Sequence, residues 1–156
     1  MINVLFVCLG NICRSPMAEA VFKDLVAQTG LSHQIQVDSV GTAGYHEGEL
    51  AHYGARQVLA THGIQCHSVS RQISRTDLSE ADYIIAMDRD NRADLKAMSR
   101  GIPLDGRLHL LLDFAEGERR SEVPDPYYTG RFEEVYRLVR AGCEGLLAHI
   151  RREHDI

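Results

Sequence analysis

The chain has 156 residues, of which 44% are hydrophobic and 25% charged, a composition typical of one globular domain and not of a disordered chain. Seventeen basic and twenty-two acidic residues give a net charge of -5, which excludes a general electrostatic attraction to nucleic acid or to an anionic membrane. The N-terminal apolar run is too short for a signal peptide or a membrane span. We therefore expect a single domain over residues 1–156, located in the cytoplasm, where thiols stay reduced.

Short apolar segments alternate with amphipathic ones along the chain. Strands are expected over residues 2–7, 35–40, 83–87 and 108–114, and the uniformly apolar run over 2–7 is typical of a central strand covered on both faces. Helices are expected from Ser15, as N-cap, up to Gly30 and over residues 51–62, 76–80, 88–99 and 132–150, with loops over 41–50 and 115–129. This alternation predicts an α/β fold, a doubly wound, flavodoxin-like, four-stranded parallel sheet with helices on both faces. Ligands of such a sheet bind at the carboxyl ends of its strands.

The segment directly after the first strand reads Cys8-Leu9-Gly10-Asn11-Ile12-Cys13-Arg14-Ser15-Pro16. Backbone N–H groups at a helix N-terminus and a nearby guanidinium stabilise a thiolate, so Cys8 is a candidate nucleophile. The same N–H groups can form an anion-binding nest, and Gly10 and Asn11 are the residues most able to adopt the positive φ angles that such a nest often needs. The segment therefore predicts a phosphate-binding loop.

Arg14 and Ser15 extend this prediction from binding to chemistry. The planar guanidinium of Arg14 matches two phosphate oxygens and would hold phosphorus in line with Cys8. The hydroxyl of Ser15 can donate to the Cys8 sulfur and so ease the departure of the thiolate, a role that competes with capping the helix.

Other interpretations of the four cysteines are weaker. A buried free cysteine is commonly structural, but the spacing of Cys8, Arg14 and Ser15 between a strand and a helix favours chemistry over packing. The loop has neither the Gly-Lys-Ser/Thr of a nucleotide-binding loop nor the Gly-x-Gly-x-x-Gly of a dinucleotide-binding one. A zinc site would need a second Cys or His pair at ligand spacing. No metal or cofactor is expected, and Cys66 and Cys143 are interpreted as inert fillers.

With these residues identified, the sequence resembles the low-molecular-weight protein tyrosine phosphatases. The loop from Val7 to Pro16 matches their signature almost residue for residue. The likeness continues in the same order through Asp38-Ser39, His62-Gly63-Ile64, Ser70-Arg71-Gln72-Ile73, Met87-Asp88 and Asp125-Pro126-Tyr127-Tyr128. It covers nearly the whole chain.

The resemblance implies a metal-independent hydrolysis of phosphotyrosine in proteins, and of small aryl phosphates, through a phosphocysteine intermediate. It implies three catalytic residues: Cys8 as nucleophile, Arg14 as phosphoryl-binding group, and Asp125 as acid for the leaving phenoxide and then base for water. A phosphate or sulfate ion would be bound by the loop residues Leu9, Gly10, Asn11, Ile12, Cys13 and Ser15.

Further roles follow from the same resemblance. Tyr45, Tyr127 and Tyr128 would form the walls of a cleft deep enough for phosphotyrosine and too deep for phosphoserine or phosphothreonine. Cys13 would form a reversible disulfide with Cys8.

Ser39 would support the phosphate-binding loop together with Asn11 and Ser15. Many eukaryotic members have a histidine beside the loop asparagine where this chain has Ser68, with His67 before it, which leaves the partner of Asn11 open. Asp88 and Arg71 are interpreted as structural, as a helix N-cap and an ion-pair partner.

Two rival functions stay open at this point. An arsenate reductase on the same fold would bind arsenate in the same loop, but Cys66 and Cys143 are too far apart to resemble its reactive pair. A catalytically silent phosphoprotein-binding or redox-sensing module would also keep the fold, although intact Cys8, Arg14 and Asp125 argue against it.

Overall fold

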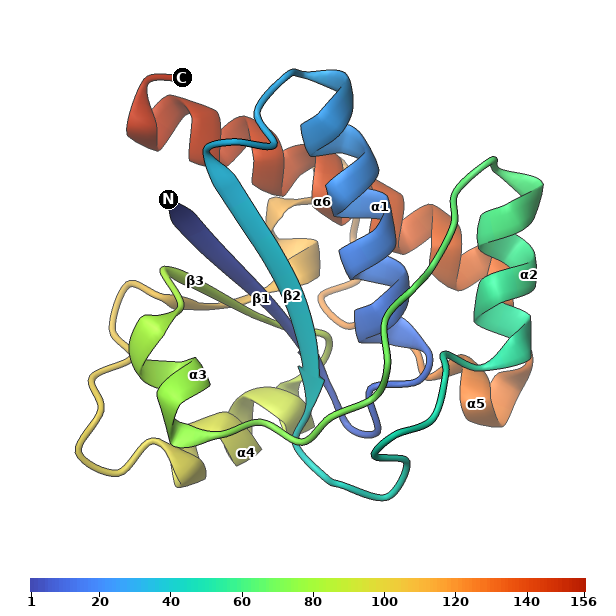
Figure 1. Ribbon diagram of the computed structural model, residues 1–156, viewed down its shortest axis with the longest axis horizontal. Coiled ribbons are helices and arrows are strands. Elements are labelled where there is room, and N and C mark those ends of the chain that lie inside the picture. The colour runs from blue at the N-terminus through green and yellow to red at the C-terminus, as the bar shows by residue number, and fades with distance from the viewer.

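The computed structural model describes residues 1–156 and contains one four-stranded parallel sheet of order β2-β1-β3-β4 (Figure 1). Its strands are β1 (Ile2–Cys8), β2 (Ile35–Gly41), β3 (Tyr83–Ala86) and β4 (Leu108–Leu110). In the register of the sheet, Val4 on the central strand lies beside Val37 on one side and Tyr83 on the other. The predicted doubly wound α/β fold is confirmed.

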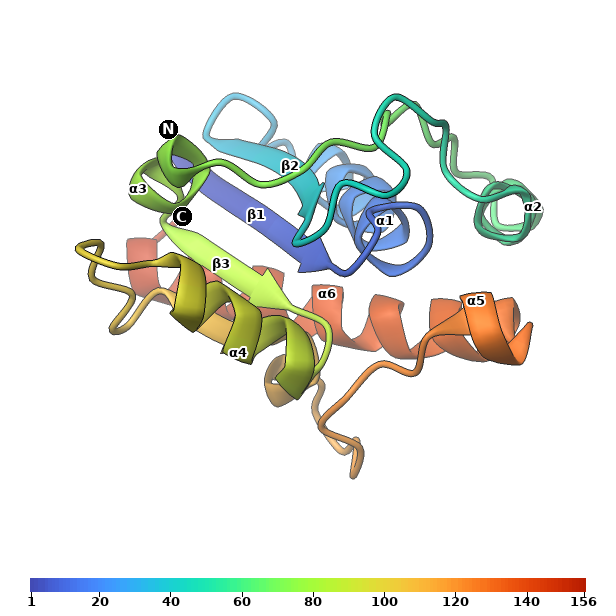
Figure 2. The ribbon, with the colours of Figure 1, turned by 90° about the horizontal axis from the view of Figure 1, so that it is seen from below.

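Helices cover both faces of this sheet (Figures 1 and 2). They are α1 (Arg14–Gln28), α2 (Tyr53–Thr61), α3 (Arg75–Glu80), α4 (Arg89–Met98), the 3-10 helix η1 (Leu111–Phe114), α5 (Pro126–Thr129) and α6 (Phe132–His154). Helices α1 and α6 pack together over one face, whereas α3 and α4 cover the other. No helix combines the length and the apolar character needed to cross a membrane.

The apolar character of the strands is explained by two cores, one on each side of the sheet. The larger contains 32 buried residues and lies between the sheet, α1 and α6, where Phe6 and Phe22 meet edge to face with their ring centroids 5.5 Å apart. The smaller contains 10 buried residues, among them Leu78 of α3 and Leu95 of α4. From Val4 to Cys8, the residues of β1 enter the two cores alternately, so neither face of this stretch meets water.

The prediction of a strand over residues 108–114 is wrong in its second half. Strand β4 ends at Leu110, and the chain turns into η1, which buries Leu111 and Leu112 against α6. The predicted loop over 115–129 is also interrupted, because Asp125 caps the short helix α5 by accepting a hydrogen bond from the backbone N–H of Tyr127 at 3.1 Å. Apolar periodicity alone does not separate a strand from a tight helical turn that is fully buried.

Two glycines of α6 permit the close approach of η1. A Cβ at Gly145 would overlap the carbonyl oxygen of Phe114, and one at Gly142 would overlap the Leu111 side chain. On an exposed helix surface, Gly→Ala stabilises by up to about 1 kcal/mol. We expect Gly145→Ala to do the opposite and to lower the free energy of unfolding by about 2 kcal/mol, because a backbone carbonyl has little room to move. Urea unfolding measures this, and a midpoint that is unchanged or raised would contradict the packing described.

Candidate active site

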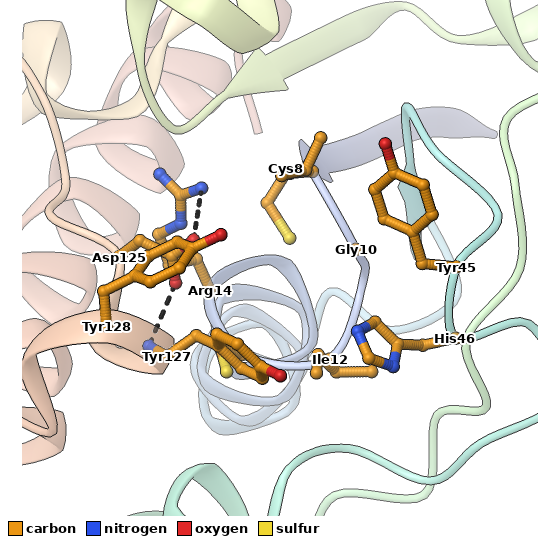
Figure 3. Close-up of a pocket in the computed structure, with 11 residues that line it drawn as sticks. Cys8, Gly10, Ile12, Arg14, Tyr45, His46, Asp125, Tyr127 and Tyr128 are labelled. Atoms are coloured by element: carbon orange, nitrogen blue, oxygen red, sulfur yellow. Dashed lines mark hydrogen bonds and ion pairs between the residues drawn. The ribbon is translucent and has the colours of Figure 1, made fainter.

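A cavity of about 250 Å³ opens at the carboxyl end of β1 (Figure 3). Its walls come from the β1–α1 loop, from the loop after β2 and from the start of α5. The lining residues are Cys8, Leu9, Gly10, Ile12, Cys13, Arg14, Tyr45, His46, Asp125, Tyr127 and Tyr128. The structure thus brings the N-terminal loop next to a carboxylate more than a hundred residues away, at the edge of the sheet where ligands of this architecture bind.

The Cys8 sulfur points into this cavity and has one hydrogen-bond partner, the hydroxyl of Ser15, at 3.0 Å. Ser15 is not the N-cap that the sequence predicts: α1 begins at Arg14, and Cys13 precedes it without a capping side chain. Ser15 therefore lies within the first turn of the helix, where its hydroxyl is directed at the thiol. The expected competition between capping and catalysis does not arise in this structure.

The buried side chain of Asn11 connects the β1–α1 loop to neighbouring segments of the chain. Its backbone has a φ of 55°, in the left-handed region, whereas Gly10 does not have the positive φ expected for it. The Asn11 side chain is buried and donates to the hydroxyls of Ser15 at 2.8 Å and Ser39 at 3.0 Å. Its Oδ1 accepts the backbone N–H of Arg71 at 3.1 Å, so this amide and not Ser68 supplies the support that the sequence left open. Asn11, Ser15 and Ser39 lie behind the cavity wall, not on it.

Arg14 is the buried cation of the site. One nitrogen of its guanidinium binds Asp88 Oδ2 at 2.6 Å and the carbonyl of Val123 at 3.0 Å, and the other lies 3.4 Å from Asp125 Oδ2. Burial opposes the charge of Arg14, but Cys8, Asp88 and Asp125 outweigh it and raise the pKa of the guanidinium. Arg14 is thus a permanent positive charge in a fixed position, the property that binding a dianion requires.

Asp125 and three tyrosines form the mouth of the cavity. The carboxylate of Asp125 is held between Arg14 and the backbone N–H of Tyr127 (Figure 3). The rings of Tyr127 and Tyr128 meet edge to face at 5.3 Å, and Tyr45 lies across the opening. All three tyrosine side chains are exposed. The mouth is therefore lined by flat aromatic surfaces that could contact a ring entering from solvent.

All four cysteines are free thiols, but they differ in their surroundings. Burial, with the neighbouring Cys8 and Asp125, raises the pKa of Cys13 to about 12, and burial raises the pKa of Cys143 as well. Cys66 lies outside the cavity, with its sulfur 3.5 Å from the Ser68 hydroxyl. The raised pKa makes Cys13 a poorer nucleophile at neutral pH than an ordinary thiol.

Comparison with known proteins identifies the family. The model of the low molecular weight phosphotyrosine protein phosphatase family matches residues 3–155. The chain belongs to this family. It is 50% identical, over the whole of both chains, to a protein of Bacillus subtilis named low molecular weight protein-tyrosine-phosphatase YfkJ. The crystal structure of YfkJ from Bacillus subtilis superposes with a TM-score of 0.94, over 98% of this chain and 96% of that one. A structure described as drosophila arginine phosphatase, 34% identical, superposes with a TM-score of 0.87 over 97% and 98% of the two chains.

Sequence reasoning missed one cavity residue of this phosphatase, His46. Its Nδ1 pairs with Glu49 Oε2 at 2.9 Å, and its ring lies 6.1 Å from that of Tyr127. A Cβ at Gly10 would come to 3.0 Å from the His46 ring, so the glycine makes room for the histidine. The only available signal was the position of His46 next to Tyr45 in the long loop after β2.

A second missed residue is Glu19, a carboxylate of α1 that is only 5% exposed. It accepts a hydrogen bond from Ser39 at 2.5 Å and so joins the network under the phosphatase loop. A signal for it exists in the sequence, because Glu19 follows Ser15 by four residues and residues four apart share one face of a helix. Because Ser15 is expected to face the loop, the same helix face should bring the Glu19 side chain toward the interior.

Gly41, at the end of β2, is required by the same loop. A Cβ there would come within 2.8 Å of the Leu9 carbonyl and 2.9 Å of the Ala43 carbonyl. The close approach lets Thr42 and Ala43 donate backbone hydrogen bonds to Cys8 and Leu9 at 2.9 and 3.0 Å. These two hydrogen bonds connect the start of the β1–α1 loop to the segment that follows β2.

Arg71 couples the loop of the phosphatase to α3. Its backbone supports Asn11, while its guanidinium binds Asp77 at 2.9 Å and Asp38 at 2.7 Å. The ion-pair role predicted for Arg71 is present in the structure. Burial raises the pKa of the Asp77 carboxyl, but the hydrogen bonds from Arg71 and Ser74 outweigh burial and lower it.

This lowered pKa predicts how stability depends on pH. Folded Asp77 binds fewer protons than unfolded Asp77, so its contribution is fully present above the ordinary value of about 4 and is lost as the pH falls through the folded value. We expect Asp77→Asn to lower the free energy of unfolding at pH 7 by about 1.5 kcal/mol and to flatten its fall in acid. Urea midpoints measured from pH 7 downwards test this, and an equally steep acid limb in the variant would contradict it.

Proposed function

We propose that this phosphatase hydrolyses phosphotyrosine in proteins by transferring the phosphoryl group to Cys8 and then to water. The observation that carries the proposal is the convergence of a thiol, a buried guanidinium and a carboxylate on one cavity. Arg14 and the backbone N–H groups of residues 9–15 would hold the phosphoryl oxygens. Inorganic phosphate, the product, and sulfate would occupy the same loop and compete with the substrate.

In the first step, the Cys8 thiolate attacks phosphorus and the bond from phosphorus to the phenolic oxygen breaks. Asp125, in its acid form, gives its proton to that oxygen, so the leaving group departs as neutral tyrosine. Arg14 balances the charge on the transferred oxygens.

In the second step, the Asp125 carboxylate takes a proton from a water molecule, whose oxygen attacks the phosphorus of phosphocysteine. The sulfur–phosphorus bond breaks and inorganic phosphate leaves. The hydroxyl of Ser15, 3.0 Å from the sulfur, donates to the departing thiolate. Asp125 is then protonated again and ready for another substrate.

The aromatic mouth supports phosphotyrosine as the substrate class. Tyr45, Tyr127 and Tyr128 offer ring faces to an aryl group, whereas a phosphoserine side chain gains nothing from them and does not span the same depth. We expect kcat/KM for phosphotyrosyl peptides to exceed that for matched phosphoseryl peptides by about a hundredfold or more.

The assay that tests this function compares phosphotyrosyl, phosphoseryl and phosphoarginyl peptides of one sequence, with a metal chelator present throughout. Phosphotyrosine hydrolysis that persists with chelator supports the proposal. A preference for phosphoarginine would replace it with the activity named for the drosophila relative. Thiol-dependent arsenate reduction would favour the reductase, and tight phosphopeptide binding without turnover would favour a silent binding module.

Cys13 is proposed as a redox partner of Cys8. Peroxide would oxidise the Cys8 thiolate to a sulfenic acid, and the Cys13 sulfur would displace water from it to form a disulfide. A nucleophilic thiol of this kind needs a reducing compartment, which supports a cytoplasmic location. We expect mild peroxide to inactivate the enzyme, and a dithiol to restore it. Mass spectrometry that finds no bond between Cys8 and Cys13 in the oxidised protein would refute this role.

A further inference from the structure

Glu19 is a buried carboxylate for which the proposed reaction has no use. It lies on α1 one turn after Ser15 and has two partners. Its Oε1 accepts the proton of the Ser39 hydroxyl at 2.5 Å, and its Oε2 pairs with Lys23 at 2.5 Å. The Lys23 side chain is half exposed, so the contact with Ser39 is the one that faces the interior.

The hydrogen bonds under the loop have a definite direction. Because Asn11 Oδ1 accepts the backbone N–H of Arg71, the NH2 group of Asn11 must face the hydroxyls of Ser15 and Ser39. Each hydroxyl receives a hydrogen from Asn11 and must send its own proton elsewhere.

The two protons have different acceptors. That of Ser39 goes to Glu19. That of Ser15 can go to the Cys8 sulfur at 3.0 Å or to the Val40 carbonyl, which at 3.4 Å is the weaker acceptor. The shorter contact favours donation from Ser15 to Cys8, and this is the direction that stabilises a thiolate.

We propose that Glu19 is a positioning residue for the reaction, because it accepts the Ser39 proton and thereby orients the chain of hydrogen bonds so that Ser15 donates to Cys8. The inference rests on the proposed role of Cys8 as nucleophile. Without an acceptor at residue 19, the buried Ser39 hydroxyl turns its proton toward Asn11 and competes with Arg71 for Oδ1. The Asn11 amide is then no longer fixed, and the donation from Ser15 to Cys8 weakens.

A purely electrostatic role for Glu19 would have the opposite sign. A negative charge near Cys8 disfavours its thiolate, so removing that charge would make the thiolate easier to form. Loss of the acceptor, in contrast, makes the thiolate harder to form. The other ionisable groups around Cys8, which are Arg14, Asp88, Asp125, His46 and Cys13, stay the same in every variant below.

The experiment compares Glu19→Met, which removes both charge and acceptor, with Glu19→Gln, which removes the charge and keeps an acceptor oxygen. The readouts are kcat/KM for a phosphotyrosyl peptide and the pH midpoint of Cys8 alkylation by iodoacetamide. We expect Glu19→Met to lower kcat/KM about tenfold and to raise the midpoint by about one pH unit, the size of one lost hydrogen bond to a charged group. Glu19→Gln should recover most of both.

Lys23→Met is the matched control, because it removes the ion pair and leaves the Ser39 contact in place. It should leave kcat/KM and the alkylation midpoint unchanged. Similar downward shifts of the midpoint in Glu19→Met and Glu19→Gln would overturn the proposal in favour of a charge effect.

Ser39→Ala keeps the proposal testable if Glu19→Met does not fold. It removes one of the two hydroxyls that accept from the Asn11 NH2 group, so the amide is held less firmly and the alkylation midpoint should rise. Because the contact with Glu19 is already lost, adding Glu19→Gln to it should change little. An unchanged midpoint in Ser39→Ala would overturn the inference. If Cys8→Ser loses activity as expected while these midpoints do not move, only the role of Glu19 fails. If Cys8→Ser stays active, the proposed function itself fails.

Discussion

Replacing Cys8 by serine will abolish turnover while leaving phosphate bound at the loop. A serine hydroxyl has no thiolate form at neutral pH, and the structure places no general base beside it, since the one hydrogen-bond partner of the Cys8 sulfur is Ser15. We expect kcat to fall by roughly a thousandfold or more, as in other hydrolases that lose their nucleophile. Arg14 and the loop amides remain, so the affinity for inorganic phosphate should stay close to that of the unchanged protein.

Cys66→Ser is the matched control for this substitution. It makes the same chemical change at a partly buried thiol outside the cavity, so both activity and phosphate affinity should persist. Single-turnover kinetics and phosphate titration distinguish the two variants. Substantial activity in Cys8→Ser, or a loss of the same size in Cys66→Ser, would show that the sulfur of Cys8 is not the group that attacks phosphorus.

Asp125→Asn should reveal the acid through the leaving group. An amide cannot transfer a proton to phenoxide, so kcat/KM with phosphotyrosine, which reports only the steps up to loss of the phenol, is expected to fall by about a hundredfold or more. The phenol of tyrosine has a pKa of about 10 and needs that proton, whereas a nitrophenol leaves readily without it. The loss should therefore be much smaller with a nitrophenyl phosphate.

The fold of this variant should be preserved, because an asparagine side chain can still accept the backbone N–H of Tyr127 and cap α5. Asp105→Asn, at an exposed turn, is a control that should change neither substrate. Steady-state kinetics on both substrates provide the measurement. Equal losses of kcat/KM with the two leaving groups would exclude Asp125 as the proton donor.

The fold was predictable in part because its central strand has to be apolar on both sides. Residues 2–7 carry no polar side chain but Asn3, and only a strand at the centre of a covered sheet accommodates such a run. Family membership was predictable from the residues between Cys8 and Pro16, since few loops need a thiol, a glycine and an arginine at these distances. The fold and the family membership both depend on local sequence patterns, which is why both could be predicted from the sequence.

Other features depend on contacts between segments that are far apart in the sequence. The apolar residues Leu111 and Leu112 are typical of a strand, but in the structure they lie in η1. The turn is explained by the close packing of η1 against α6, which Gly142 and Gly145 make possible. Serine is a common N-cap residue, but α1 begins at Arg14, one residue before Ser15. The Ser15 hydroxyl therefore lies in the first turn of the helix, next to the Cys8 sulfur.

The partner of Asn11 shows the same limit. It is the backbone N–H of Arg71, sixty residues away. Every residue except proline has such a group, so the residue type at position 71 does not indicate the contact. Glu19 differs in that its spacing from Ser15 was visible, but its buried contact with Ser39 depends on how α1 packs against β2. Such contacts follow from packing between segments and not from local pattern.

The most direct test of phosphoryl transfer through Cys8 is to stop the reaction with acid during turnover of phosphotyrosine and to locate the phosphoryl group by mass spectrometry. A phosphocysteine intermediate predicts one added phosphoryl group on the peptide that contains Cys8, and none on that peptide in Cys8→Ser. Phosphate on another residue would contradict transfer through Cys8. So would the absence of a labelled peptide when Asp125→Asn turns over a nitrophenyl phosphate, because that leaving group needs no acid and only the second step is slowed.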